Sequence, residues 1–86
     1  MPEIEVTVRN PHGLHARPAA LFVQKAASFP CSVQVLKGER SADAKSILGI
    51  MSLAIEPGET IRIRAEGEQV QEALAALEAV AKDTTA

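Results

Sequence analysis

The stretch Gly13-Leu14-His15-Ala16-Arg17-Pro18-Ala19 holds the side chains of this sequence that are best suited to chemistry. A histidine stands where a turn-forming segment gives way to a helical pattern, and an arginine follows two positions later. The first turn of a helix has N–H groups without intrahelical partners and a partial positive charge. An imidazole placed there can accept a phosphoryl group, because the helix end stabilises the new negative charge. The stretch therefore predicts a protein that carries phosphate on His15.

The residues around His15 fit this chemistry. An attacking imidazole must be neutral, and both the helix start and the Arg17 guanidinium disfavour a protonated ring. After transfer, we expect the backbone N–H groups of Ala16 and Arg17 to bind the phosphoryl oxygens, with a charge-assisted contact from the Arg17 side chain. Pro18 lacks an N–H, which a first-turn residue does not need. The alternative is a helix-capping histidine without chemistry.

For His12 and Cys31, which also have reactive side chains, we expect structural roles. His12 lies three residues before His15, and the sequence offers no adjacent cysteine or clustered carboxylates to complete a metal site. We interpret it as a solvated turn residue. Cys31 is the only cysteine, so it can form no internal disulfide and is expected to be a small apolar residue that is buried or half-buried. No metal and no organic cofactor is predicted.

The elements that must position these residues follow from the spacing of apolar side chains. Apolar and polar residues alternate over 4–9, 32–37 and 61–66, which predicts strands with one buried face. A hairpin turn at 37–40 predicts a short antiparallel strand near 40–43. Helical spacing predicts helices from residue 16 to the Ser28-Phe29-Pro30 stop, over 46–54 and over 70–80. The order β-α-β-β-α-β-α over residues 1–86 predicts one α+β domain whose helices cover one face of the sheet.

Composition excludes several classes of protein. The chain has 86 residues, a formal net charge of −2 and only two aromatic residues, so nucleic-acid binding through phosphate neutralisation or base stacking is not expected. No apolar run approaches the length of a membrane span, and the N-terminus lacks the apolar segment of a signal peptide. With its lone cysteine, the chain is expected to be a cytoplasmic protein without membrane insertion.

The stretch 13–20, together with Asp43-Ala44-Lys45-Ser46-Ile47-Leu48-Gly49-Ile50-Met51-Ser52-Leu53, resembles the HPr family. These are the histidine-containing phosphocarrier proteins of the bacterial phosphoenolpyruvate-dependent sugar phosphotransferase system. The resemblance covers essentially the whole chain. It implies an open-faced β-sandwich, with four antiparallel strands in the order 1-4-2-3 and three helices on one face. The strand order is implied by the resemblance, since periodicity cannot provide it.

The resemblance also implies a role for His15. By this resemblance, phosphorylated enzyme I is expected to phosphorylate the residue on Nδ1, and the group is then expected to pass to the IIA domains of sugar permeases. The chain is thus expected to be a monomeric carrier and regulator that forms a phosphohistidine, without a complete active site of its own.

Ser46 is a second candidate phosphorylation site. As the residue before a short helix, it is expected to accept a hydrogen bond from an early helix amide. The resemblance adds phosphorylation by the ATP-dependent HPr kinase/phosphorylase of many Gram-positive relatives, with a catabolite-control transcription regulator as a further partner. A phosphate there would add negative charge near the docking face and slow phosphoryl acceptance at His15.

The helix predicted over 46–54 has more apolar residues than one narrow buried face can accommodate. Ile50 and Leu53 are predicted to lie in the core. A predicted exposed docking patch consists of Arg17, Ala20, Ile47, Leu48 and Met51. The alternative is that all of the apolar residues are core.

Three other functions are compatible with the sequence. A regulatory or nitrogen-branch paralogue of the same family is one alternative, although the retained His15 argues against a paralogue that has lost the chemistry. A small ligand-sensing α+β domain has the same architecture, because a fold does not determine a function. An acylphosphatase-like domain would need an arginine loop and an asparagine, and Asn10 is the only asparagine.

Overall fold

The computed structural model describes residues 2–83 and contains the seven elements in the predicted order. Their bounds are β1 Glu3–Thr7, α1 Ala16–Ala27, β2 Ser32–Lys37, β3 Arg40–Asp43, α2 Ile47–Ser52, β4 Thr60–Glu66 and α3 Val70–Lys82. The short middle helix therefore begins one residue after Ser46 and ends before the predicted residue 54. None of these helices is both long and apolar enough to cross a membrane, within the part of the chain that the structure describes.

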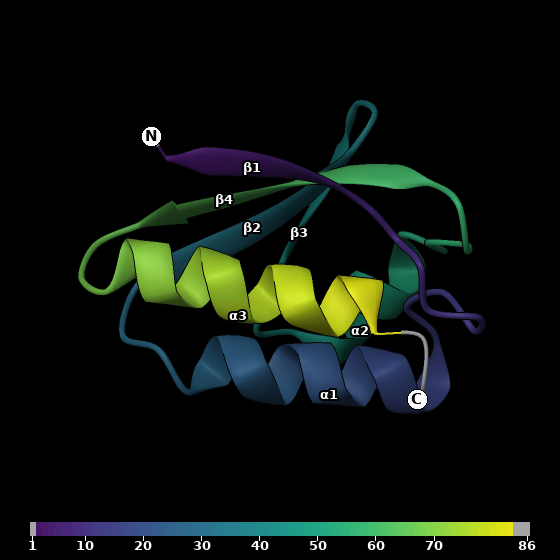
Figure 1. The fold of residues 1–86 in the computed structure, drawn as a ribbon, viewed down its shortest axis with the longest axis horizontal. Helices are drawn as coiled ribbons and strands as arrows, with labels where there is room; N and C mark the ends of the chain where they lie inside the picture. Colours follow the sequence, from purple (N-terminus) through teal and green to yellow (C-terminus); the bar gives the residue numbers. More distant parts are fainter. Residues whose placement is uncertain (1, 84–86) are drawn as a thin grey trace.

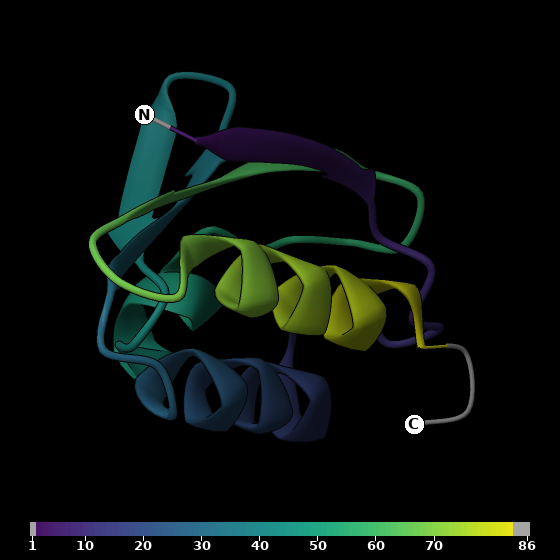
Figure 2. The same ribbon diagram turned by 60° about the vertical axis from the view of Figure 1, so that its left-hand side comes forward.

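The four strands form one antiparallel sheet in the order β1-β4-β2-β3. Figures 1 and 2 show the three helices on the same side of this sheet, with α1 and α3 running side by side. The open-faced β-sandwich and its strand order are confirmed. The arrangement leaves the loops before α1 and after α2 at one end of the molecule, where the candidate site lies.

The core lies between the sheet and the helices, and it follows the alternation of the strands. Every second residue of β2 and β4 points inward, so that Val33, Val35 and Ile63 are fully buried. Phe22 of α1 and Leu77 of α3 cover them from the helical side. Three sequence predictions are confirmed by the burial of Ile50, Leu53 and Cys31.

The other face of the sheet carries charged side chains. Glu3 of β1 lies opposite Arg64 of β4, and the Arg64 guanidinium binds one carboxylate oxygen at 3.0 Å. Arg62 approaches the second oxygen at 3.5 Å. The hydrogen bond from Arg64 lowers the pKa of the Glu3 carboxyl below its usual value. This face is polar, as the alternating strands predict.

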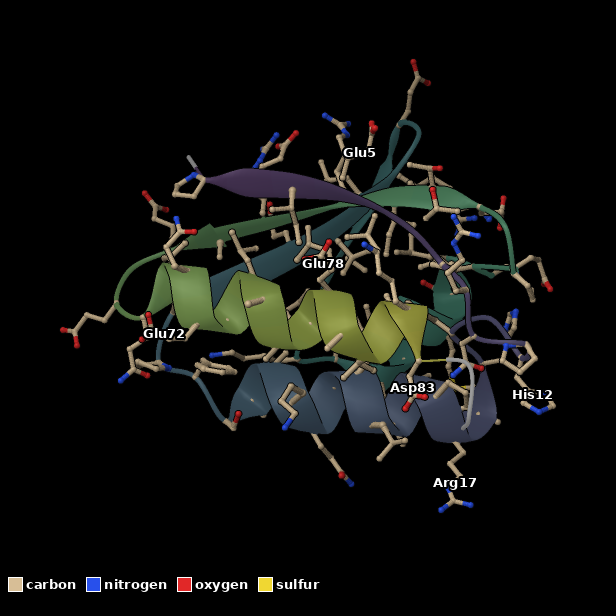
Figure 3. All side chains as sticks on the ribbon, viewed as in Figure 1. Glu5, His12, Arg17, Glu72, Glu78 and Asp83 are labelled. Atoms are coloured by element: carbon tan, nitrogen blue, oxygen red, sulfur yellow. The ribbon has the colours of Figure 1, made fainter. Side chains whose placement is uncertain are left out.

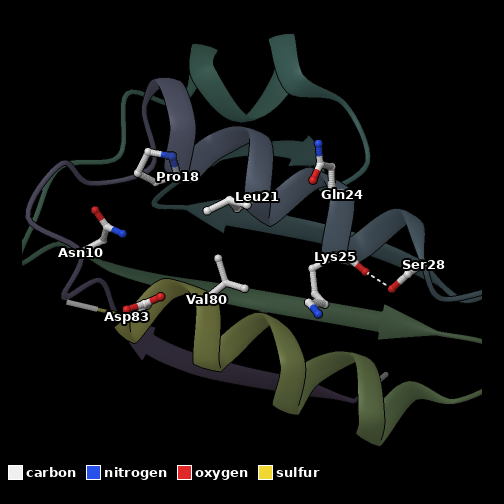
Figure 4. A pocket seen from close by; sticks show the side chains of 8 residues that line it. All are labelled: Asn10, Pro18, Leu21, Gln24, Lys25, Ser28, Val80 and Asp83. Atoms are coloured by element: carbon white, nitrogen blue, oxygen red, sulfur yellow. Dashed lines mark hydrogen bonds between the residues drawn. The ribbon is translucent and has the colours of Figure 1, made fainter. Parts of the chain in front are cut away.

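A groove of about 370 Å³ separates α1 from α3 on the helical side. Figure 4 shows Leu21 and Val80 facing each other across it, with Lys25 and Asp83 at its rim. Asn10 lines one end and is buried, where its Oδ1 accepts the backbone N–H of His12 at 3.0 Å. The burial of Asn10 was not predicted from the sequence.

Candidate functional site

His15 is the N-cap of α1, the residue that immediately precedes the helix. Its backbone is extended, with φ −115° and ψ 157°, and its carbonyl accepts the Ala19 N–H at 3.4 Å. The imidazole makes no hydrogen bond to the first-turn amides. Because first-turn amides lack intrahelical partners, those of Ala16 and Arg17 are available to an anion that approaches this end of the helix.

Ala16 has a backbone conformation that is unusual for a residue with a side chain. Its φ is +49°, in the left-handed region. An L-residue there costs roughly 1–2 kcal/mol relative to the right-handed helical region. Such strained residues persist only where the surrounding structure enforces them, and they cluster at functional sites. The left-handed step is the turn by which the chain passes from the extended His15 into α1.

Three of the predicted site residues, His15, Ala16 and Arg17, line a surface depression of about 440 Å³ at the start of α1. His12 and Pro18 complete its lining. The His15 side chain is 34% exposed, so the ring is neither in the core nor free of its surroundings. Figure 3 shows His12 and Arg17 at the same end of the molecule, with the Arg17 side chain extending away from the protein. Arg17 has no hydrogen-bond or ion-pair partner among residues 2–83.

Glu56 is a site residue that the sequence reading missed. Its Oε2 lies 2.9 Å from Nε2 of His15, and the two residues are 41 positions apart in the sequence. The sequence places Glu56 in a Glu-Pro-Gly-Glu turn, which is a pattern typical of solvent-exposed loops. Only the strand order, which brings this turn beside the loop before α1, could have indicated the pairing.

The turn that carries Glu56 is itself held by a small polar network. The backbone N–H of Glu56 donates to Oε1 of Glu59 at 2.7 Å, and Lys37 Nζ lies 3.0 Å from the same oxygen. This N–H, and secondly Lys37, hold the pKa of the Glu59 carboxyl below its usual value. Lys37 also donates to the carbonyls of Leu53 and Ala54, just after α2. The network therefore joins the loop after α2 to the residue that contacts His15.

Ser46 is the N-cap of α2, as predicted. Its Oγ accepts the Gly49 N–H at 3.1 Å, and its carbonyl accepts the Ile50 N–H at 3.0 Å. A side chain at Gly49 would crowd the Ser46 side chain and Cβ of Ala42 in β3, so glycine permits the close approach of α2 to the sheet. This packing gives a structural reason for a residue that weakens a helix by about 1 kcal/mol relative to alanine.

Three apolar side chains of α2 are exposed beside α1. Leu48 is 78% exposed, and Ile47 and Met51 are exposed as well, whereas Ala20 of α1 is half-buried. The alternative that all of these residues are core is wrong. Leu21 of α1 is also exposed and was not predicted to be. Apolar side chains that remain exposed together at one end of a small domain are a feature of protein-docking surfaces.

The site as a whole is suited to receiving an anion. It combines an imidazole at a helix start, two first-turn amides and a guanidinium that has no partner among residues 2–83, while the Glu56 carboxylate contacts the imidazole. Among the described residues, no group of three or more His, Cys, Asp and Glu side chains is arranged to hold a metal ion.

The sequence matches a protein-family model and several known proteins. Residues 2–83 match the family described as "PTS HPr component phosphorylation site". The phosphocarrier protein HPr of Pseudomonas aeruginosa is 47% identical over 78 residues, which cover 90% of this chain and 87% of that protein. The HPr-like protein Crh of Bacillus subtilis is 46% identical over 83 residues, covering 96% of this chain and 98% of the relative. The crystal structure of a phosphocarrier protein HPr from Bacillus anthracis superposes with a TM-score of 0.91 at 48% identity, covering 93% and 95% of the two chains.

Proposed function

The chain belongs to the HPr family of phosphocarrier proteins, and from this premise we propose that His15 accepts a phosphoryl group from phosphorylated enzyme I and passes it to the IIA domains of sugar permeases. The ring nitrogen that takes the group in this proposal is Nδ1. The protein acts as a phosphorylated intermediate between two partners.

The observation that carries this proposal is the position of His15. The ring is partly exposed at the start of α1, where it makes no capping hydrogen bond to the helix, and Arg17 lines the same depression. A phosphoryl group on Nδ1 can be held by the amides of Ala16 and Arg17 and by the Arg17 guanidinium. Since Arg17 has no partner among the described residues, it can turn toward the phosphate without breaking an existing contact.

The same features allow the group to leave again. The depression is open to solvent and contains one arginine, so the phosphoryl group is held by few contacts. A deeply buried group with several arginine partners would be bound too tightly for transfer to a second protein. A carrier requires that both partners reach the same histidine from outside.

We assign the docking of these partners to the patch formed by Arg17, Ala20, Ile47, Leu48 and Met51. The exposed apolar side chains of α2 support this assignment, because burial in a protein complex removes them from water. Arg17 adds a positive charge beside the histidine, which favours a partner of opposite charge.

The proposal is tested by incubating the protein with phosphoenolpyruvate and enzyme I. We expect a phosphoryl label that is labile in acid and stable in base, as a phosphohistidine is, and that is absent from His15→Ala. Label that persists in His15→Ala, or no label on the unsubstituted protein, would contradict the proposal.

A regulatory role of Ser46 is a second proposal, supported by the similarity to the HPr-like protein Crh. Phosphorylation by an HPr kinase/phosphorylase would place a dianion next to the docking patch, where it repels an acidic partner, and it would prepare the protein for a catabolite-control transcription regulator. Incubation with ATP and the kinase should give acid-stable phosphate that Ser46→Ala loses. Continued labelling of Ser46→Ala would identify another target.

We further propose that residues 1–86 act as one HPr-like domain and as a monomer. Sedimentation equilibrium should then give the mass of a single chain, 9.1 kDa, across the working concentration range. A mass that doubles with concentration would contradict the monomer.

A further inference from the structure

The contact between His15 and Glu56 defines which ring nitrogen carries a proton. Nε2 of His15 lies 2.9 Å from Oε2 of Glu56. An ionised carboxylate can only accept hydrogen bonds, so the ring nitrogen must donate. In a neutral imidazole one nitrogen bears hydrogen and the other has a lone pair. A proton on Nε2 therefore leaves the lone pair on Nδ1.

Backbone contacts hold the segments that carry His15 and Glu56 next to each other. The Leu14 N–H donates to the Ile55 carbonyl at 3.0 Å, which joins the residues immediately before His15 and Glu56. Leu14 and Ile55 are both fully buried, so this connection is anchored in the core. Gly13 packs so closely on the backbone of Ile55 and Glu56 that a Cβ would collide with the Ile55 carbonyl oxygen.

We propose that Glu56 is a positioning residue for His15, which holds the ring with hydrogen on Nε2 and so presents the Nδ1 lone pair to the phosphoryl donor. This inference rests on the proposed phosphorylation of His15. It assigns to Glu56 a role toward the ring, without direct contact with the transferred group.

The transfer step explains why a carboxylate suits this position. The Nδ1 lone pair forms the new N–P bond, while the bond between phosphorus and its donor atom breaks and its electron pair stays on the donor. The hydrogen on Nε2 does not move, so the ring gains a positive charge. Glu56 faces the nitrogen that shares this charge, as the buried aspartate of a serine-protease triad faces its histidine.

The expected size of the effect is modest because the pair is exposed. The Glu56 side chain is 61% exposed and that of His15 is 34% exposed. Pairs of this kind change an equilibrium by about two- to fivefold. The ratio of the two neutral ring forms should change by that factor when the carboxylate is removed.

The test is nitrogen-15 NMR of the ring-labelled protein, which distinguishes the two neutral forms of His15 by the chemical shifts of Nδ1 and Nε2. We expect Glu56→Ala to lower the ratio of the Nε2–H form to the Nδ1–H form by about two- to fivefold. Glu56→Gln should keep most of the original ratio, because its amide oxygen still accepts from Nε2. Glu39→Ala, the same substitution at an exposed residue of the β2–β3 turn, should leave the ratio unchanged. An unchanged ratio in Glu56→Ala would overturn the proposal.

Phosphorylation kinetics with enzyme I separate this inference from the proposed function. Glu56→Ala should lower kcat for phosphoryl acceptance by about two- to fivefold and leave the KM for this protein unchanged. A loss in KM alone would make Glu56 a docking residue and overturn the positioning role. If the unsubstituted protein accepts no phosphate at His15, the proposed function fails, whatever the ring form measured by NMR.

Discussion

The candidate phosphorylation residues, His15 and Ser46, each immediately precede a helix, and the two helices begin in different ways. The N-caps His15 and Ser46 are both extended, with φ −115° and −110°. The Ser46 hydroxyl accepts an amide of its own helix at 3.1 Å, whereas the His15 ring turns away from its helix to the Glu56 carboxylate. The start of α2 is thus closed by a side chain, and the start of α1 is left open. The open start is suited to receiving an anion, and the closed start is suited to stabilising the fold.

A glycine supports each of these starts, for different reasons. Gly13 has φ +62° and lies against the Ile55 backbone, which holds the loop before α1 beside Glu56. Gly49 lies within α2, where the lack of a Cβ leaves room for Ser46 and Ala42. The first glycine permits a contact between distant segments at the site, and the second permits the packing of a helix on the sheet.

The largest expected effect on phosphoryl transfer concerns the open start of α1. Arg17→Ala should slow phosphoryl acceptance about 10- to 100-fold, because a hydrogen bond to a charged group contributes about 1.5–3 kcal/mol. Stability should change by less than about 0.5 kcal/mol, since the exposed guanidinium has no partner among the described residues. Label transfer from phosphorylated enzyme I measures the rate. Arg9→Ala, which removes an exposed positive charge elsewhere, is the control, and an equal loss in that variant would indicate general electrostatic attraction.

Of the substitutions considered in this Discussion, Gly13→Ala should lower the free energy of unfolding the most. We expect a loss of about 2–3 kcal/mol in the free energy of unfolding, from the left-handed backbone together with the collision with Ile55. Denaturant unfolding measures it. Gly38→Ala is a matched control, because its φ is +61° but nothing lies within 4 Å of the added Cβ. Equal losses in both variants would show that the close approach contributes nothing.

The contrast between the two N-caps predicts a difference between two alanine variants. Ser46→Ala removes the cap of α2 and should lower the free energy of unfolding by about 1 kcal/mol. His15→Ala removes no capping hydrogen bond and should change the free energy of unfolding by less than about 0.5 kcal/mol. Thermal or denaturant unfolding of the pair tests this order. Equal destabilisation by His15→Ala and Ser46→Ala would show that the two helix starts do not differ in this way.

The smallest expected effect concerns the turn behind the open start. The pKa of the Glu59 carboxyl is lowered by the Glu56 N–H and by Lys37. A carboxyl with a lower pKa in the folded state contributes stability above its unfolded pKa, and this contribution is lost as the pH falls through the folded pKa. Glu59→Gln should therefore show a slightly flatter loss of stability in acid than the unsubstituted protein, measured by unfolding at a series of acidic pH values. Glu39→Gln should not flatten the curve, and identical curves for all three proteins would contradict the role of Glu59.

The elements and the core could be predicted from the sequence because local patterns determine them. Alternation identified the strands, and turn residues such as Lys37-Gly38-Glu39-Arg40 separated them. Strand order could not be obtained in this way, since alternation specifies which face a residue takes and not which strand lies next to it. It came from the resemblance to the HPr family.

The candidate site was predictable in part for the same reason. His15, Arg17 and Pro18 are close in sequence, so their common location follows from one helix start. Glu56 belongs to a turn 41 positions away, and its pairing with His15 depends on long-range packing around Gly13. The burial of Asn10 could not be predicted either. A polar residue among turn-forming residues is usually exposed, and local sequence does not indicate that the tertiary structure covers this one.

The most direct test of phosphoryl transfer at His15 is NMR of the phosphorylated, nitrogen-15-labelled protein. We expect one-bond coupling between phosphorus and Nδ1 of His15, with hydrogen retained on Nε2. Coupling to Nε2, or phosphorus attached to any other residue after reaction with enzyme I, would contradict the account.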